Sequence, residues 1–369
     1  MEKQLFGKVA IIGVGLMGGS LGMALRNRRL AGEVVGVFRD QGKIENALML
    51  GAVDKGTVHL SEAVENAELV VLAAPVGMSI SIIKEILPLL KPGCIITDLG
   101  STKGEITEKV EEFLPADLYF VGGHPMTGSE ESGVEAANPY LLENAIYVLT
   151  VTKKTNTTAL QILKLMVEEI GAQGLVLDPR EHDLLVGSVS HLPHLAAVLL
   201  VNTLPEIGVD MGKALFLATG GFRDTTRIAM SSPFMWRDIF LSNREMILEI
   251  LEVFKEKIQV FEQILENGDG ENLVKEFETA RETRLNIPKR VKGLLPGIYD
   301  LVVLVGDVPG VIGKMATLFG NTDINIKDIE ILKNREEEGG SIRFSFSTLE
   351  ERDRAVKTLK AEGIQVVVR

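Results

Sequence analysis

The stretch from Lys8 to Leu25 constrains the fold more than any other part of this 369-residue chain. It opens with a short apolar run, residues 9–12, typical of a strand buried on both faces of a parallel sheet. Gly13, Gly15 and Gly18 follow in G-x-G-x-x-G spacing, which permits a tight turn, close approach of a pyrophosphate and close helix packing. We expect a dinucleotide here, and a plain strand-to-helix turn is the alternative. The residues expected to contact it are Gly13, Gly15, Leu16, Met17 and Gly18.

The end of the second predicted strand, residues 33–38, bears on which dinucleotide is bound. Where such sites usually keep an acid for the adenosine ribose, this chain has Phe38, followed by Arg39 and Asp40. An arginine can receive a 2′-phosphate or stack on adenine, whereas Asp40 can reach the ribose hydroxyls. NAD and NADP therefore both stay open, with a slight preference for NAD.

Further strands are predicted at 69–73, 94–97 and 118–121, separated by helical patterns such as 78–90. This alternation predicts a doubly wound parallel sheet, which one more strand-helix-strand unit at 146–177 completes. Ligands of such sheets lie beyond the carboxyl ends of the strands. Three segments hold that place: Ala74-Pro75-Val76, Asp98 to Lys103 with Ser101, and Gly122 to Gly128 with His124.

Composition excludes several classes of protein. The net charge of −12 argues against nucleic acid or an anionic membrane surface as a partner. The single cysteine, Cys94, allows neither an internal disulfide nor a cysteine metal cluster. The N-terminus lacks the pattern of a signal peptide, and no apolar run approaches about 18 residues. We expect a cytoplasmic protein of two or three domains.

The pattern of predicted elements changes after residue 178, from alternating strands and helices to helices alone. Residues 1–178 make the dinucleotide-binding domain, whereas 179–287 show long helical patterns without a convincing strand. The large apolar content of this helical domain suggests that it also buries surface against another subunit. Residues 288–298 are a linker rich in proline, glycine and cations, and 299–369 follow a βαββαβ order.

His124 is the sharpest catalytic candidate. It lies two glycines beyond the predicted strand, and Pro125 keeps it extended. Histidine is the side chain best able to exchange a proton near neutral pH. The alternative is a histidine that hydrogen-bonds the base of the loop.

Two polar groups stand out in the helical domain. Ser190 and His194 are four residues apart and share a helix face, which Pro193 kinks, whereas His191 lies on another face and is more plausibly structural. The alternative for the pair is a polar seam between helices. Residues 220–227 place two arginines and an acid behind two glycines, and a guanidinium can grip a carboxylate through two hydrogen bonds. Trp236 follows this segment, and its ring either packs in the core or supports a bound ligand. No arrangement of residues in the sequence offers plausible metal ligands.

Three motifs that follow one another along the chain are together typical of one enzyme family, and the resemblance covers essentially the whole chain. They are Gly-His-Pro-Met-x-Gly-x-Glu around His124 to Glu130, Ser-His-Leu-Pro-His at 190–194, and Gly-Gly-Phe-Arg-Asp-Thr-Thr-Arg at 220–227. With them, the chain resembles the prephenate dehydrogenases that carry a C-terminal ACT regulatory domain. The resemblance implies a Rossmann-like domain, a helical dimerisation domain, and oxidative decarboxylation of prephenate with NAD or NADP in tyrosine biosynthesis.

The resemblance also implies roles for single residues. His124 takes the proton of the substrate hydroxyl with Ser101 beside it, Arg227 grips a carboxylate, and His194 contacts the substrate. In the ACT-like domain, the turn with Asp307, Pro309 and Gly310 resembles an effector site for tyrosine, and its alternative is an ordinary helix start. The remaining residues expected at the substrate or the site entrance are Glu130, Ser190, Gly220, Asp224 and Trp236.

Two other functions are weighed. Arogenate dehydrogenase, or a cyclohexadienyl dehydrogenase that accepts both substrates, differs only in the side chain of the substrate. A dinucleotide-sensing regulator without chemistry belongs to another class, and the set of Ser101, His124, Ser190, His194 and Arg227 argues against it.

Overall fold

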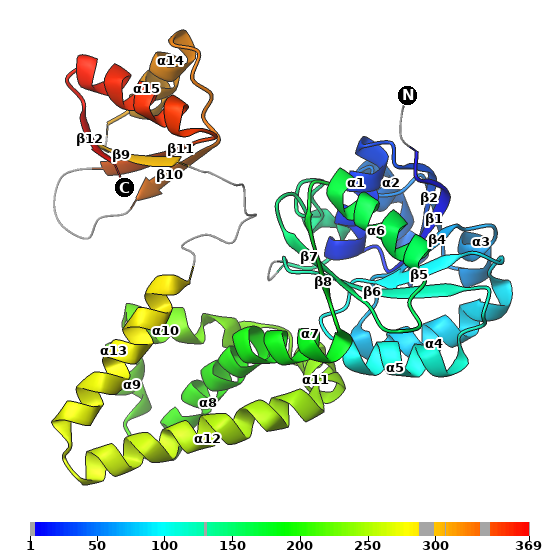
Figure 1. The fold of residues 1–369 in the computed structure, drawn as a ribbon, viewed down its shortest axis with the longest axis horizontal. Helices are drawn as coiled ribbons and strands as arrows, with labels where there is room; N and C mark the ends of the chain where they lie inside the picture. Colours follow the sequence, from blue (N-terminus) through cyan, green and yellow to red (C-terminus); the bar gives the residue numbers. More distant parts are fainter. Residues whose placement is uncertain (1–3, 129–130, 288–298, 307, 333–339, 369) are drawn as a thin grey trace. The chain divides into compact units, whose positions relative to one another are not determined.

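The computed structural model describes residues 4–128, 131–287, 299–306, 308–332 and 340–368. The chain divides into two compact units, residues 1–293 and 294–369, which are described separately (Figure 1). Glu130 and Asp307, two of the expected site residues, lie outside the described residues, and so does the expected linker at 288–298.

The first unit is built on an eight-stranded sheet in the order β3-β2-β1-β4-β5-β6-β7-β8. β1 pairs in parallel with β2 on one side and with β4 on the other, so the strand order reverses beside β1, where doubly wound sheets bind their ligands. This confirms the expected Rossmann-like architecture. The strands are β1 (Phe6–Ile12), β2 (Ala31–Val37), β3 (Lys55–Thr57), β4 (Leu69–Leu72), β5 (Ile95–Asp98), β6 (Tyr119–Pro125), β7 (Ile146–Thr150) and β8 (Gln173–Leu177).

The last two strands depart from the parallel pattern. β7 runs antiparallel to β6, with His124 opposite Val148, and β8 is parallel to β7. A parallel neighbour would need a crossover that returns the chain to the other end of the sheet, usually through a helix. Between β6 and β7 the described residues hold only the short 3₁₀ turn Val134–Ala136, so the chain comes back alongside β6.

Helices cover both faces of the sheet (Figure 1). α1 and α6 bury one apolar cluster against it, and α3, α4 and α5 bury another. The strands between them are apolar on both faces, as buried parallel strands require. These helices are α1 (Leu16–Asn27), α2 (Ile44–Met49), α3 (Leu60–Val64), α4 (Val76–Ile86), α5 (Gly104–Phe113) and α6 (Thr157–Glu169).

The rest of the first unit is helical, as expected, but the helical pattern that begins at residue 179 is interrupted. Gly187–His191 forms a π-turn between α7 and α8. Pro193 has no N–H to donate to the carbonyl four residues earlier, and a wider turn accommodates that loss. The helices are α7 (Pro179–Val186), α8 (Leu192–Glu206), α9 (Met211–Leu217), α10 (Gly220–Thr226), α11 (Pro233–Ser242), α12 (Arg244–Glu266) and α13 (Gly270–Asn286).

Much of this helical part is apolar and uncovered in the single chain. Pro179–Glu206 is long and apolar enough to cross a membrane by length and composition alone. An 18-residue window within it has a mean hydropathy of 1.8, and 28% of that window is buried. Ser190, His191 and His194 divide this segment, so its uninterrupted apolar runs stay short, as expected, and only the averaged hydropathy is high. Phe216, Met230 and Phe234 are 87%, 81% and 73% exposed. A surface of this kind marks an interaction site.

The second unit confirms the βαββαβ order. Its four strands form an antiparallel sheet in the order β10-β11-β9-β12, and α14 and α15 contribute to the core through Phe319 and Leu359. The elements are β9 (Tyr299–Val305), α14 (Val311–Asn321), β10 (Asp328–Leu332), β11 (Gly340–Phe346), α15 (Leu349–Ala361) and β12 (Gln365–Val368).

Candidate active site

The glycine turn between β1 and α1 has a different steric requirement at each glycine. Gly13 has φ +98°, and a Cβ there would lie 2.7 Å from the Ala73 carbonyl oxygen. A Cβ on Gly18 would lie 2.2 Å from the Gly13 carbonyl oxygen, whereas a Cβ on Gly15 would meet nothing within 4 Å. Gly13 and Gly18 are therefore required by the fold, and Gly15 faces open space.

The start of α1 is suited to an anion. Gly15 is its N-cap and supplies no side-chain hydrogen bond, so the first N–H groups of the helix are left for a ligand. Leu16 and Met17 form the first turn and are half-buried, and Ala74 and Pro75 follow β4 at the same edge of the sheet. These residues fit the phosphates of a dinucleotide.

The adenosine end of this site lacks an acid at the end of β2. Phe38 is buried in the core and packs beside Gly36 and Gly56. The Asp40 carboxylate accepts a hydrogen bond from the Gly42 N–H at 2.9 Å and so caps its own turn. Arg39 is exposed, with Nη2 2.7 Å from the Met78 sulfur. The exposed side chains here are thus Arg39, a cation, and Asp40, whose carboxylate is already engaged by its own turn.

His124 lies inside β6, because that strand extends four residues beyond its expected end at residue 121. Its imidazole is half-buried, and Nδ1 lies 2.8 Å from Nε2 of His182 on α7. Nδ1 of His182 lies 2.8 Å from Oδ1 of Asp183. Burial lowers the pKa of His124 well below 6.5, and the neighbouring His182, Lys103 and His191 lower it further. His124 is thus a neutral base near pH 7.

The loop after β5, which carries the half-buried Ser101, is held by buried charges. Lys103 and Asp98 form an ion pair and are 0% and 1% exposed. Asp98 also accepts hydrogen bonds from Gly100 and Gly123, at 2.9 and 3.2 Å. The loop therefore has a fixed position against β6.

Asp183 joins this loop to the helical part of the unit. Its two carboxylate oxygens accept the N–H groups of Lys103 and Gly104, both at 2.7 Å. The sequence reading missed Asp183 and His182. Their one visible signal was a His-Asp pair within a helix, which by itself does not distinguish a site from a solvated face.

The π-turn and the start of α8 place two of the expected residues against α11. The rings of His194 and Trp236 stack at 3.6 Å with an angle of 9° between their planes. His194 Nδ1 and Trp236 Nε1 are buried without a hydrogen-bond partner in the described part of the chain, so two polar atoms are left for a ligand. Burial lowers the pKa of His194. Ser190 is half-buried in the π-turn, and Nδ1 of the buried His191 lies 3.1 Å from Asn243 Nδ2.

The segment at 220–227 forms α10 and the turn that follows it. Gly220 opens the helix, and Asp224 and Arg227 are exposed in the single chain. The 3₁₀ turn Arg227–Met230 packs against α8, the helix that carries His194. The structure thus joins His124 to α7 by hydrogen bonds and stacks His194 on Trp236, whereas Arg227 lies on a neighbouring turn.

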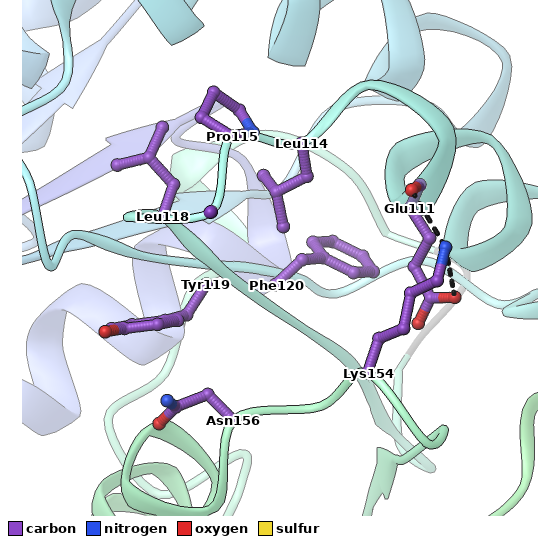
Figure 2. A pocket seen from close by; sticks show the side chains of 9 residues that line it. Glu111, Leu114, Pro115, Leu118, Tyr119, Phe120, Lys154 and Asn156 are labelled. Carbon is purple, nitrogen blue, oxygen red and sulfur yellow. Dashed lines mark hydrogen bonds and ion pairs between the residues drawn. The ribbon is translucent and has the colours of Figure 1, made fainter.

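A separate cavity of about 280 Å³ lies near the start of β6, at the end of the sheet away from the glycine turn (Figure 2). It is lined by Leu118 and Phe120 near the start of β6, and the Lys154 amine donates to the Glu111 carbonyl at 3.2 Å. Because it is remote from the carboxyl ends of β1, β4 and β5, it is not part of the candidate site.

Comparisons with known proteins agree with this geometry. Residues 21–176 match the family model described as prephenate dehydrogenase, nucleotide-binding domain, and residues 178–279 match its dimerization domain. Prephenate dehydrogenase from Bacillus subtilis is 36% identical over 361 residues, 98% of this chain and 97% of that protein. A prephenate dehydrogenase from Aquifex aeolicus, solved with hydroxyphenyl propionate and NAD+, superposes with a TM-score of 0.71 at 36% identity, over 76% of this chain and 98% of that one. Arogenate dehydrogenase from Synechocystis superposes with a TM-score of 0.66 at 29% identity. The match covers 75% of this chain and 98% of that one.

Proposed function

The chain belongs to the prephenate dehydrogenase family of NAD-dependent oxidoreductases, and we propose that it decarboxylates prephenate oxidatively to 4-hydroxyphenylpyruvate with His124 as the base. The observation that carries this proposal is the half-buried His124 imidazole at the end of β6, neutral near pH 7 and fixed by a hydrogen bond to α7. Its test is the absorbance of reduced nicotinamide when the protein is mixed with prephenate and NAD. No reduction with prephenate would overturn it.

His124 takes the proton of the substrate hydroxyl, with Ser101 beside it. NAD, when bound, accepts the hydride, and loss of carbon dioxide makes the ring aromatic. The residues have mainly to orient and deprotonate a dianion on a chain of charge −12. Arg227 and His194 supply the local cation and hydrogen bonds for its carboxylates. We assign Glu130, Ser190, Gly220, Asp224 and Trp236 to the rest of the substrate pocket.

Two choices within this function are settled by the same assay. Arogenate carries an amino group in place of the pyruvyl ketone, and the likeness to an arogenate dehydrogenase makes it the second substrate to test. We propose NAD as the cofactor and expect NADP to be accepted as well, because Arg39 is exposed where a 2′-phosphate would lie. Turnover of both substrates with both dinucleotides measures each preference.

Gly15→Ala tests the cofactor site. We expect KM for NAD to rise by about 10- to 150-fold, the effect of losing one or two hydrogen bonds to a charged phosphate, because the new Cβ would occupy the open space beside the turn. Tm should stay within about 2 °C, since that Cβ meets no protein atom. Gly18→Ala is the comparison and should destabilise the fold. A wild-type KM in Gly15→Ala would remove this turn from the cofactor site.

We divide the work of the chain as follows. Residues 1–178 bind the dinucleotide, and residues 179–287 complete the substrate site and pair with a second copy in a homodimer. Residues 288–298 connect these two domains to residues 299–369, which regulate the activity. Support for the pairing comes from the exposed apolar side chains of the helical part, such as Phe216 and Phe234, and from the matched dimerization domain. We place the enzyme in the cytoplasm.

The second unit supports a regulatory proposal. Gly310 has φ +87° and is the N-cap of α14, directly after Pro309, so the chain turns sharply at the expected effector site. We expect tyrosine to lower turnover of the full chain by about 5- to 150-fold, the usual range of a coupling between two sites. Phenylalanine, which lacks the hydroxyl, is the matched control ligand. Turnover that saturating tyrosine leaves unchanged would show that this unit does not respond to it.

A further inference from the structure

Three titratable side chains form one hydrogen-bonded row that ends at the proposed base. His124 on β6 contacts His182 through Nδ1 and Nε2, and His182 contacts Asp183 through Nδ1 and Oδ1, both at 2.8 Å. His182 and Asp183 are 0% and 3% exposed. The row therefore joins the end of the sheet to the interior of the helical part, with the Nε2 atom of His124 at its free end.

The contacts of Asp183 determine where the protons lie. Its carboxylate accepts the N–H groups of Lys103 and Gly104 as well as its contact with His182. A group that receives two backbone donors is an acceptor toward its third partner also, so Nδ1 of His182 carries hydrogen. Nε2 of a neutral His182 is then an acceptor, and Nδ1 of His124 has to be the donor.

We propose that His182 and Asp183 are positioning residues that hold His124 as its Nδ1–H tautomer, with Nε2 unprotonated toward the substrate hydroxyl. The inference rests on the proposed role of His124 as the base. In the reaction the substrate O–H bond breaks and its proton forms a bond to Nε2, so that His124 becomes an imidazolium. Its Nδ1–H stays on His182, and the negative charge of Asp183 stabilises the row during this step.

Titratable groups face His124 from each element that packs against it. His182 faces it from α7, Lys103 from the loop after β5, and His191 from the π-turn, whereas Asp98 neutralises Lys103. These groups make a positive charge on His124 unfavourable before reaction. The neutral form is the one in which the tautomer matters.

Nitrogen NMR of wild-type protein labelled with ¹⁵N-histidine tests the assignment directly. The chain has five histidines, and His59, exposed on a loop, gives the reference signal of a solvated ring. We expect the Nδ1–H, Nε2-unprotonated pattern for both His124 and His182, assigned with single His→Gln variants. The opposite pattern at His124 would overturn the proposal.

Asp183→Asn gives the kinetic test. Asparagine removes the negative charge from the row. With its N–H₂ group toward His182 it also faces the Lys103 N–H, reverses both hydrogen bonds of the row and leaves hydrogen on Nε2 of His124. We expect kcat to fall by about 10²- to 10⁴-fold with KM for prephenate little changed, the size of effect seen when a base is held in the wrong tautomer. The matched control is Asp178→Asn, since Asp178 is exposed and caps the same helix and asparagine caps equally well.

His182→Phe covers the case in which Asp183→Asn does not fold, because it removes the row and leaves the backbone contacts of Asp183 intact. It should lower kcat by about 10- to 100-fold and shift the acid limb of the kcat profile. Unchanged kcat and pH profile in a folded variant would overturn the inference while the proposed function stands. Absence of prephenate turnover in the wild type would overturn the function, and the NMR pattern would still test the row.

Discussion

His124→Asn is expected to lower kcat by about 10²- to 10⁴-fold with a modest change in KM for prephenate. Asparagine retains a hydrogen-bonding side chain but cannot take up a proton, so substrate still binds and the proton is no longer removed. Steady-state reduction of NAD with prephenate measures both constants. Turnover like that of the wild type would remove His124 from the mechanism.

The matched control for this variant is His59→Asn, since His59 is exposed and lies outside the candidate site. The pH profile adds a second measurement. Because burial lowers the pKa of His124 well below 6.5, the imidazole stays neutral as the pH falls through 6.5, and kcat/KM is lost only at more acidic pH. An acid limb centred above 6.5 would contradict this environment for His124.

Arg227→Ala is expected to raise KM for prephenate by about 10- to 150-fold with a smaller change in kcat. A guanidinium bound to a carboxylate contributes on the order of 1.5 to 3 kcal/mol, and this contribution is the same before and during the reaction. Arg227 is exposed on the turn that packs against α8, so its removal should leave the fold intact. Saturation with prephenate measures the effect.

Arg223→Ala is the control, because Arg223 lies one turn earlier on α10, is also exposed, and has no proposed role. Arg227→Lys separates charge from geometry, since lysine keeps the charge but not the two-pronged hydrogen bonding. We expect lysine to restore part of the affinity. Equal KM values in the wild type and Arg227→Ala would show that the carboxylate is held elsewhere.

Local patterns explain why much of the fold could be predicted. The G-x-G-x-x-G turn and the apolar strand before it are encoded within a few neighbouring residues. The βαββαβ order of the second unit follows from apolar residues that recur with the period of a strand in some segments and of a helix in others. The direction of β7 could not be predicted in this way. It depends on the path of the chain between β6 and β7. The spacing of apolar residues indicates a strand but not the direction in which that strand pairs.

The candidate site shows the same limit. His124 was predicted from its place after a strand, but its partner His182 is 58 residues away in sequence and meets it only in the folded chain. The stack of His194 on Trp236 likewise joins two helices. A sequence gives the chemistry of single side chains, whereas pairs across elements come from packing.

The enclosed ion pair of Lys103 and Asp98 restricts how this enzyme can change over evolutionary time. Losing one member strands the other charge in the interior, at a cost of about 3 to 5 kcal/mol, comparable to much of the stability of a typical domain. A lineage can therefore replace both residues together or keep both, but it cannot drift through the single substitutions. The loop with Ser101 inherits that constraint, although Ser101 itself takes no part in the pair.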